Sequence, residues 1–284
     1  YQAMEAFVHN LNTMHSRAGA QVPFSSINFG TDTSPEGRMV MKNYLLSVDA
    51  GLGRNETPIF PISIFKVKKG VNYEKEDPNY DLFRLSCEVS AKRLFPNFSF
   101  MDSPFNKQFY KGDYNTEVAY MGCRTRVMAN VVDENKAVTP GRGNLSFTSI
   151  NLPRLAIKYG IVNGNEKADM KGFFKELEEI MDMVRDQLLE RFEIQCGKRT
   201  YNFPFLLEQG VWIDSERLKN TDRLRRILKH GTLSIGFIGL AESLKALTGK
   251  HHGECAESQK LGLKIIKFMR EKCDEYAKEY NLNF

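Results

Sequence analysis

Strand-like and helix-like segments alternate from residue 25 to residue 101, and short connections join them. Residues 25–30, 59–67 and 98–101 have the composition and alternation of strands. A helix is expected from Pro35, capped by the residues before it, to Gly51, and another from residue 77 to residue 95, where Pro96 stops it. Strands joined this closely through helices form βα units. The sequence therefore predicts the α/β fold class.

The second half of the chain predicts the same alternation with longer helices. Residues 145–150 predict a strand that enters a helix at Pro153, with Asn151 in the N-cap region. Long amphipathic helices are expected at about 171–195 and 254–280, because their apolar residues recur every three or four positions. Residues 202–207 predict a short extended segment.

Two glycines lie where a further strand, residues 232–235, is expected to lead into a helix beginning near Gly236. A Gly-Phe-Ile-Gly segment at such a point has two interpretations. Its backbone N–H groups could contact a phosphate, or its glycines could allow a helix to pack closely on a strand. The segment is not G-x-G-x-x-G and has no P-loop lysine, so it does not predict a dinucleotide site.

Gly122 and Cys123 lie between two strand-like runs, residues 118–120 and 125–128, which predicts a tight loop that carries the cysteine. The glycine allows the backbone to turn where a side chain would obstruct it. Taken alone, Cys123 is most simply a small buried apolar residue. A Gly-Arg-Gly-Asn segment follows, and its Asn144 stands at the start of the strand that precedes Pro153.

At this point the sequence resembles the catalytic subunit of the anaerobic (class III) ribonucleoside-triphosphate reductase family, whose members are glycyl radical enzymes. Cys123 matches the radical cysteine of the family within Met-Gly-Cys-Arg-Thr, and Asn144 matches its ribose-binding asparagine. Four further segments resemble the family in the same order: His15–Gly30, Phe60–Gly70, Asp77–Phe83 and Ser234–Glu242.

The resemblance implies a ten-stranded α/β barrel of two antiparallel halves, with a central finger loop that carries the cysteine at its tip. The implied activity is the reduction of ribonucleoside triphosphates to 2′-deoxyribonucleoside triphosphates by thiyl radical chemistry, which supplies DNA precursors. Cys123 would abstract the 3′ hydrogen of the ribose and return it. Asn144 would hydrogen-bond the ribose hydroxyls, and Met121 and Gly122 would line the cavity beside the cysteine.

The chain starts at Tyr1 without a methionine and stops after a long helix, so we expect it to be an internal piece of a longer polypeptide. All of residues 1–284 would be part of one catalytic barrel domain. The N-terminal ATP cone, the strand with a second active-site cysteine, the C-terminal glycyl radical motif and the zinc site would lie outside it. This piece is therefore expected to be inactive alone.

The same resemblance implies the cofactors and partners. The glycyl radical would be stored outside this segment, and formate or a thiol system would act as reductant. Partners would be the ribonucleoside triphosphate substrate, nucleotide effectors, a radical S-adenosylmethionine iron–sulfur activase and a second copy of the chain in a homodimer.

Composition limits the other classes of function. The five cysteines are far apart and show no Cys-x-x-Cys spacing, so neither a metal site nor a disulfide framework is expected. His251, His252 and Cys255 are close in sequence but lack a fourth ligand. No apolar run is long enough to span a membrane and no signal pattern opens the chain, which favours a cytoplasmic protein without membrane contact.

Two alternative functions stay open at this stage. A glycyl radical enzyme of the diol dehydratase or acyl lyase type would share the barrel and the loop cysteine. Such enzymes usually carry an acidic residue soon after the cysteine, where this chain has Arg124. The other alternative is a non-catalytic α/β module whose basic residues bind anionic partners, in keeping with a net charge of +5.

Overall fold

The computed structural model describes residues 1–16, 18–122 and 125–284 and divides into two compact units. The first unit comprises residues 1–129 and 137–139, and the second comprises residues 130–136 and 140–284. The predicted α/β class is confirmed, because small parallel and antiparallel sheets alternate with helices.

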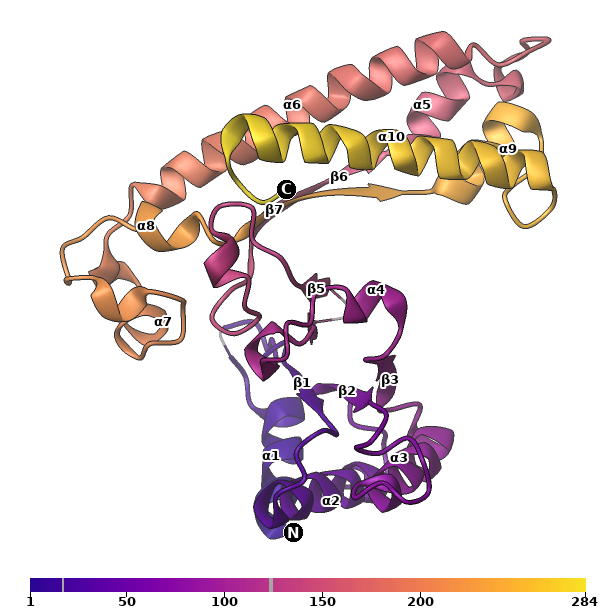
Figure 1. The fold of residues 1–284 in the computed structure, drawn as a ribbon. Coiled ribbons are helices and arrows are strands. Elements are labelled where there is room, and N and C mark those ends of the chain that lie inside the picture. The colour runs from indigo at the N-terminus through magenta and orange to yellow at the C-terminus, as the bar shows by residue number, and fades with distance from the viewer. Residues whose placement is uncertain (17, 123–124) are drawn as a thin grey trace. The chain divides into compact units, whose positions relative to one another are not determined.

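A three-stranded parallel sheet with the order β1-β2-β3 forms the centre of the first unit. Figure 1 shows α1, α2 and α3 on one side of this sheet and the β4–β5 hairpin on the other. The elements are α1 (Gln2–Thr13), β1 (Ser26–Phe29), α2 (Pro35–Ala50), β2 (Ile62–Val67), α3 (Tyr80–Arg93), β3 (Asn97–Phe100), α4 (Pro104–Lys107), β4 (Ala119–Met121) and β5 (Thr125–Val127). The β1-α2-β2-α3-β3 order is the predicted run of βα units.

The residues before β2 were expected to be part of that strand, but the strand begins only at Ile62. The side chain of Asn12 accepts hydrogen bonds from the backbone N–H groups of Ile59 and Phe60, at 2.9 and 3.0 Å. Pro61 has no N–H to donate. These backbone groups are thus held by α1 and do not enter the sheet.

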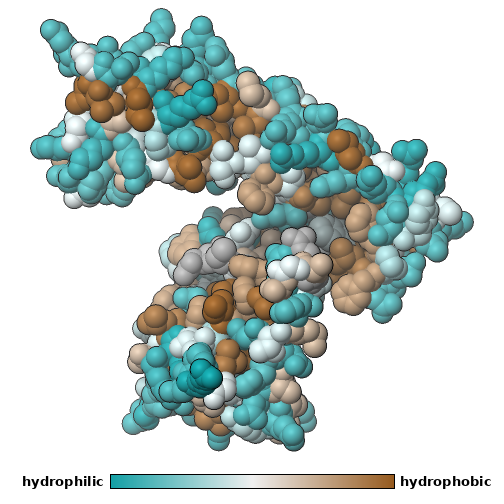
Figure 2. All heavy atoms as spheres, turned by 180° about the vertical axis from the view of Figure 1, so that it is seen from behind, coloured by the Kyte–Doolittle hydropathy of each residue, from teal (hydrophilic) through white to brown (hydrophobic). Residues whose placement is uncertain are grey.

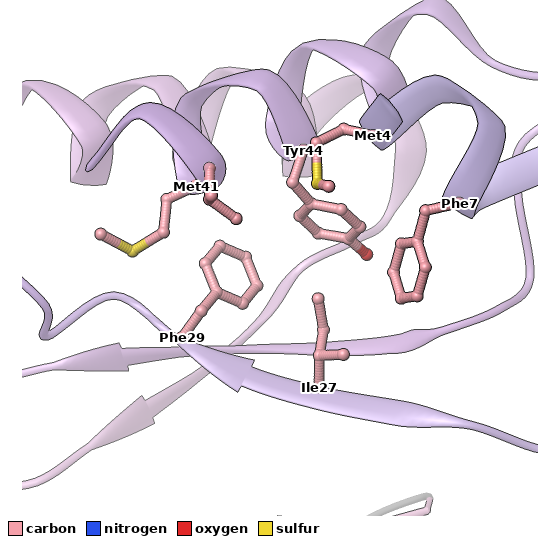
Figure 3. A pocket seen from close by; sticks show the side chains of 7 residues that line it. Met4, Phe7, Ile27, Phe29, Met41 and Tyr44 are labelled. Carbon is pink, nitrogen blue, oxygen red and sulfur yellow. The ribbon is translucent and has the colours of Figure 1, made fainter. Parts of the chain in front are cut away.

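An apolar cavity of about 300 Å³ lies between α1, α2 and β1. Figure 3 shows Ile27 and Phe29 of β1 facing side chains of both helices across it. The hydroxyl of Tyr44 is hydrogen-bonded to Ser63 Oγ and adds no polar surface to the lining of the cavity. Its lining presents only apolar surface, and because Phe7 and Val40 are exposed, it is a partly open hollow at the edge of the core of this unit.

The second unit is built on a parallel pair of strands, β6 and β7, which stay in register from Ser146↔Leu233 to Asn151↔Ile238. Figure 1 shows the long helices α6 and α10 extending along this pair. The elements are β6 (Asn144–Asn151), α5 (Leu152–Tyr159), α6 (Met170–Cys196), α7 (Pro204–Glu208), α8 (Arg225–Leu228), β7 (Thr232–Ile238), α9 (Leu240–Thr248) and α10 (Ala256–Tyr280).

The apolar stripe of α6 is core, as its periodicity predicts. Phe173, Leu177, Met181 and Leu188 are fully buried there, against apolar residues of α5, β7, α9 and α10. The strand-to-helix junction is also confirmed: Asn151 is the N-cap of α5, and its side chain accepts a hydrogen bond from Arg154 N at 3.2 Å.

Two predictions in the second unit were wrong. Residues 202–207 are not extended, because Pro204 starts the short helix α7 after a 3₁₀ turn at Thr200–Asn202. The helix expected from Gly236 begins only at Leu240, since pairing with β6 continues β7 to Ile238.

The two glycines of that segment act in packing. A Cβ on Gly236 would lie 2.8 Å from Ser149 Oγ of the neighbouring strand. Gly239 has a φ of +72°, and a Cβ there would lie 2.3 Å from Pro153 Cγ. The close-packing interpretation therefore accounts for both glycines without a phosphate.

Figure 2 shows apolar residues among polar ones on the visible face of each unit. Single exposed apolar side chains are ordinary on protein surfaces and assign no partner. Among the helices in the described part of the chain, none is long and apolar enough to cross a membrane.

Candidate active site

The predicted loop around Gly122 is the connection of the β4–β5 hairpin. The strands are antiparallel, and Met121 pairs with Thr125, so three residues separate the last paired positions. Gly122 has a φ of +52°, a conformation that L side chains rarely adopt, and a Cβ there would lie 3.1 Å from Phe24 Cε1. The expected need for glycine is confirmed. Cys123 and Arg124 lie outside the described residues.

Side chains of β1 hold the hairpin by its backbone. The Asn28 amide donates to Tyr120 O at 2.8 Å and accepts from Tyr120 N at 2.9 Å. Ser26 Oγ accepts from Gly122 N at 3.1 Å. Sequence reasoning did not identify these two residues as functional, although their alternation with Ile27 and Phe29 placed both on one face of the strand.

Glu117 is buried just before β4 and forms ion pairs with Lys66 and Lys68 at 3.0 and 2.8 Å. Burial alone would raise the pKa of this carboxyl. The hydrogen bonds and charges of the two lysines outweigh burial and hold its pKa below the ordinary value. Glu117 is therefore ionised at neutral pH and ties the start of the hairpin to the end of β2.

We expect Glu117→Gln to destabilise the protein at neutral pH by roughly 2 to 4 kcal/mol, because two half-buried lysines lose their counter-charge. The stabilisation by Glu117 is fully present above the unfolded-state pKa of about 4.3 and is lost as pH falls through the lower folded-state pKa. The difference in the free energy of unfolding between variant and wild type should therefore shrink below pH 4. Urea unfolding at pH 7 and at pH 3.5 measures this; an equal difference at both values would contradict it.

Asn144 is the first residue of β6, as expected, and its side chain is exposed. It pairs with Thr232, and the register shifts between Asn144 and Ser146. Thr232 N donates to Gly143 O at 3.0 Å, and Gly141 O accepts from Ile213 N at 2.7 Å. Asn144 also borders a mainly apolar cavity of about 190 Å³ that includes Trp212.

Buried polar side chains form a hydrogen-bonded network next to the start of β6. Arg142 Nε donates to the carbonyl of His230, which is fully buried, at 3.0 Å. His230 Nδ1 lies 3.0 Å from Asn130 Nδ2, so this ring nitrogen accepts and the proton resides on Nε2. Burial lowers the pKa of His230, which leaves it neutral at pH 7 despite Asp214 Oδ2 at 3.6 Å.

The predicted site residues thus fall in both units. Met121 and Gly122 are adjacent in the hairpin of the first unit, and Asn144 belongs to the second. Whether Cys123 and Asn144 converge stays a prediction. Within the described ranges, no three His, Cys, Asp or Glu side chains are grouped so that they could hold a metal ion. His251 instead bonds Glu254, donating its backbone N–H to the carboxylate at 2.7 Å.

The family model described as anaerobic ribonucleoside-triphosphate reductase matches residues 1–284. The anaerobic ribonucleoside-triphosphate reductase of Escherichia coli (strain K12) is 31% identical over 288 residues, which include the whole chain and 38% of that relative. The enzyme of the same name from Enterobacteria phage T4 is 34% identical over 256 residues, 89% of this chain and 40% of the relative.

The chain therefore belongs to the anaerobic ribonucleoside-triphosphate reductase family. The predicted family is confirmed, and membership argues against both alternatives, the other glycyl radical enzymes and the non-catalytic module. The chain spans 38% of the length of its Escherichia coli relative.

Proposed function

We propose that the protein to which this chain belongs reduces ribonucleoside triphosphates to 2′-deoxyribonucleoside triphosphates under anaerobic conditions in the cytoplasm. The observation that carries this proposal is the family match over residues 1–284, which includes both the hairpin around Gly122 and the strand that starts at Asn144. We further propose that the chain forms part of one catalytic domain, a ten-stranded α/β barrel. Each compact unit contains parallel strands joined through helices, and this arrangement supports a barrel built from such repeats.

Removing the ribose 2′-hydroxyl is difficult because hydroxide is a poor leaving group, and a radical on the neighbouring carbon makes its departure easier. The Cys123 sulfur, as a thiyl radical, would take the 3′ hydrogen atom, since its S–H bond is comparable in strength to a ribose C–H bond. The 2′-hydroxyl would then take up a proton and leave as water. Formate, oxidised to carbon dioxide, or a thiol system, oxidised to a disulfide, would supply two electrons and the hydrogen for the 2′ carbon, and Cys123 would return the 3′ hydrogen. Met121 and Gly122 would line the cavity beside the sulfur.

Asn144 would bind the ribose hydroxyls, because an amide can donate to one hydroxyl and accept from its neighbour. It is neutral, so it orients and polarises the substrate and does not act as a base. If both residues contact one ribose, Cys123 Sγ and the Asn144 amide should lie within roughly 10 Å of each other. A crystal structure of the intact protein checks this, and a separation across opposite faces of the fold would end the assignment.

A glycyl radical on a residue outside 1–284 would supply the unpaired electron. Cys123, which lies in sequence between the paired residues Met121 and Thr125, would receive it. We propose that a radical S-adenosylmethionine iron–sulfur enzyme generates the radical, that nucleotide effectors regulate the enzyme, and that it is a homodimer. No residue of this chain is proposed as a zinc ligand.

An anaerobic assay of the intact protein tests the function. The protein would be activated by its partner enzyme and incubated with the four ribonucleoside triphosphates and each reductant in turn. We expect the matching deoxynucleotides to accumulate with one of the reductants. Failure to form any deoxynucleotide, although the radical is present by electron paramagnetic resonance, would contradict the proposal.

A further inference from the structure

The free edge of β4 is covered by side chains of β1 instead of by another strand. Residues of an antiparallel pair direct their N–H and C=O groups alternately toward the partner and away from it. Tyr120 and Gly122 use their backbone groups on the outer side, and Asn28 and Ser26 bind them. The Asn28 amide engages both the N–H and the C=O of Tyr120, as a neighbouring strand would.

These bonds matter because the hairpin is too short to be stable alone. Its strands have three residues each, and an isolated pair of this length is marginal in water. Two further contacts attach its side chains to β3 and to α4. Ser99 Oγ donates to the Tyr120 hydroxyl at 2.9 Å, and Arg126 donates to Asn106 Oδ1 at 3.1 Å. Polar contacts thus hold β4 against the parallel sheet and join β5 to α4.

The strand that supplies the contacts is itself firmly held. Ser26 and Asn28 face the hairpin, whereas Ile27 and Phe29 face the apolar side chains of α1 and α2 (Figure 3). β1 also pairs along its whole length with β2. Any displacement of the hairpin relative to the core must therefore break the bonds made by Asn28 and Ser26.

We propose that Asn28, assisted by Ser26, is a positioning residue that holds the hairpin tip in the position required for turnover. The proposal rests on the function proposed above, because Cys123 directly follows the residue that Ser26 holds. A displacement of about 1 Å from a productive geometry can cost roughly 10²-fold in rate. Asparagine suits the position because it donates and accepts at once; aspartate can only accept, and alanine does neither.

Hydrogen–deuterium exchange on the intact, unactivated protein tests whether the contacts of Asn28 and Ser26, here called the clamp, hold the hairpin. This test needs no turnover. In Asn28→Ala we expect the amides of residues 118–122 to exchange roughly tenfold faster than in the wild type, because the bonds to Tyr120 are lost. Residues 62–67 of β2 serve as internal reference and should be unchanged. Wild-type exchange in the hairpin of Asn28→Ala would overturn the proposal.

Steady-state kinetics on the activated protein test the consequence. We expect kcat of Asn28→Ala to fall roughly 10- to 100-fold with little change in KM. Asn28→Asp, which keeps the bond from Tyr120 N–H, is the milder variant if the alanine variant fails to fold, and its kcat should also fall. An unchanged kcat in a variant whose hairpin exchanges faster would overturn the proposal.

Asn12→Ala is the matched control. The Asn12 amide binds both backbone groups of Phe60 in the same unit, donating to its O at 2.6 Å and accepting from its N at 3.0 Å. This variant should lose the same kind of contact, yet the amide exchange rates of its hairpin and its kcat should match the wild type. If Asn12→Ala and Asn28→Ala changed these quantities equally, Asn28 would have only a structural role. A wild-type protein that forms no deoxynucleotide would overturn the proposed function, and the exchange experiment would still decide whether the clamp holds the hairpin.

Discussion

Replacing Cys123 by serine is expected to abolish deoxynucleotide formation by the intact, activated protein. A serine O–H bond is much stronger than a cysteine S–H bond, so serine cannot give up its hydrogen to a protein radical, and no side-chain radical forms that could take the 3′ hydrogen of the ribose. We expect a loss of roughly 10⁴-fold or more, the scale on which removal of a reacting group acts in other enzymes. Anaerobic assays with equal radical content in variant and wild type would measure it.

The change should cost little stability, on the order of 1 kcal/mol, because a single oxygen replaces sulfur. Cys87→Ser provides the control, since Cys87 is a free, exposed cysteine on α3 of the same unit. It should retain wild-type turnover. Turnover above background in Cys123→Ser would remove Cys123 from the mechanism, whereas equal losses in both variants would point to a general effect of thiol removal.

The second large effect is expected at Asn144. Aspartate keeps the shape of asparagine but loses the N–H donor and adds a charge. A residue that only binds ribose in the ground state would raise KM when altered, but one that assists the departure of water should lower kcat. We expect Asn144→Asp to lower kcat by roughly 10²-fold, the scale of losing one well-placed hydrogen-bond donor to a reacting group, with little change in KM.

Asn151→Asp is the matched control, because it makes the same change at the other end of the same strand. Asn151 caps α5 by accepting a hydrogen bond, and aspartate caps helices equally well. We expect its kinetics to match the wild type. If Asn144→Asp kept an unchanged kcat, Asn144 would have only a structural role.

Local signals in the sequence predicted much of the fold. Asn151 and Pro153 marked the start of α5, and Gly122 marked the turn of the hairpin. The errors arose where a distant partner decides the structure. β7 continues to Ile238 because β6 lies beside it, and no residue near Gly236 encodes that pairing.

The same reason explains which site residues sequence reasoning found. Asn144 and the hairpin stood out through local glycines and the family resemblance. Asn28 did not, because its role depends on Tyr120, which lies 92 residues further along the chain. A polar residue alternating with apolar ones in a partly buried strand is the signal that indicates such a contact, but it does not identify the partner.

Turnover of a ribonucleoside triphosphate deuterated at the 3′ carbon tests the central claim most directly. Reversible abstraction by Cys123 predicts that the activated, intact protein converts this substrate more slowly than the unlabelled one. It also predicts that the deoxynucleotide retains the deuterium at the 3′ carbon. Equal rates for both substrates, together with product formation by Cys123→Ser, would contradict a mechanism centred on this cysteine.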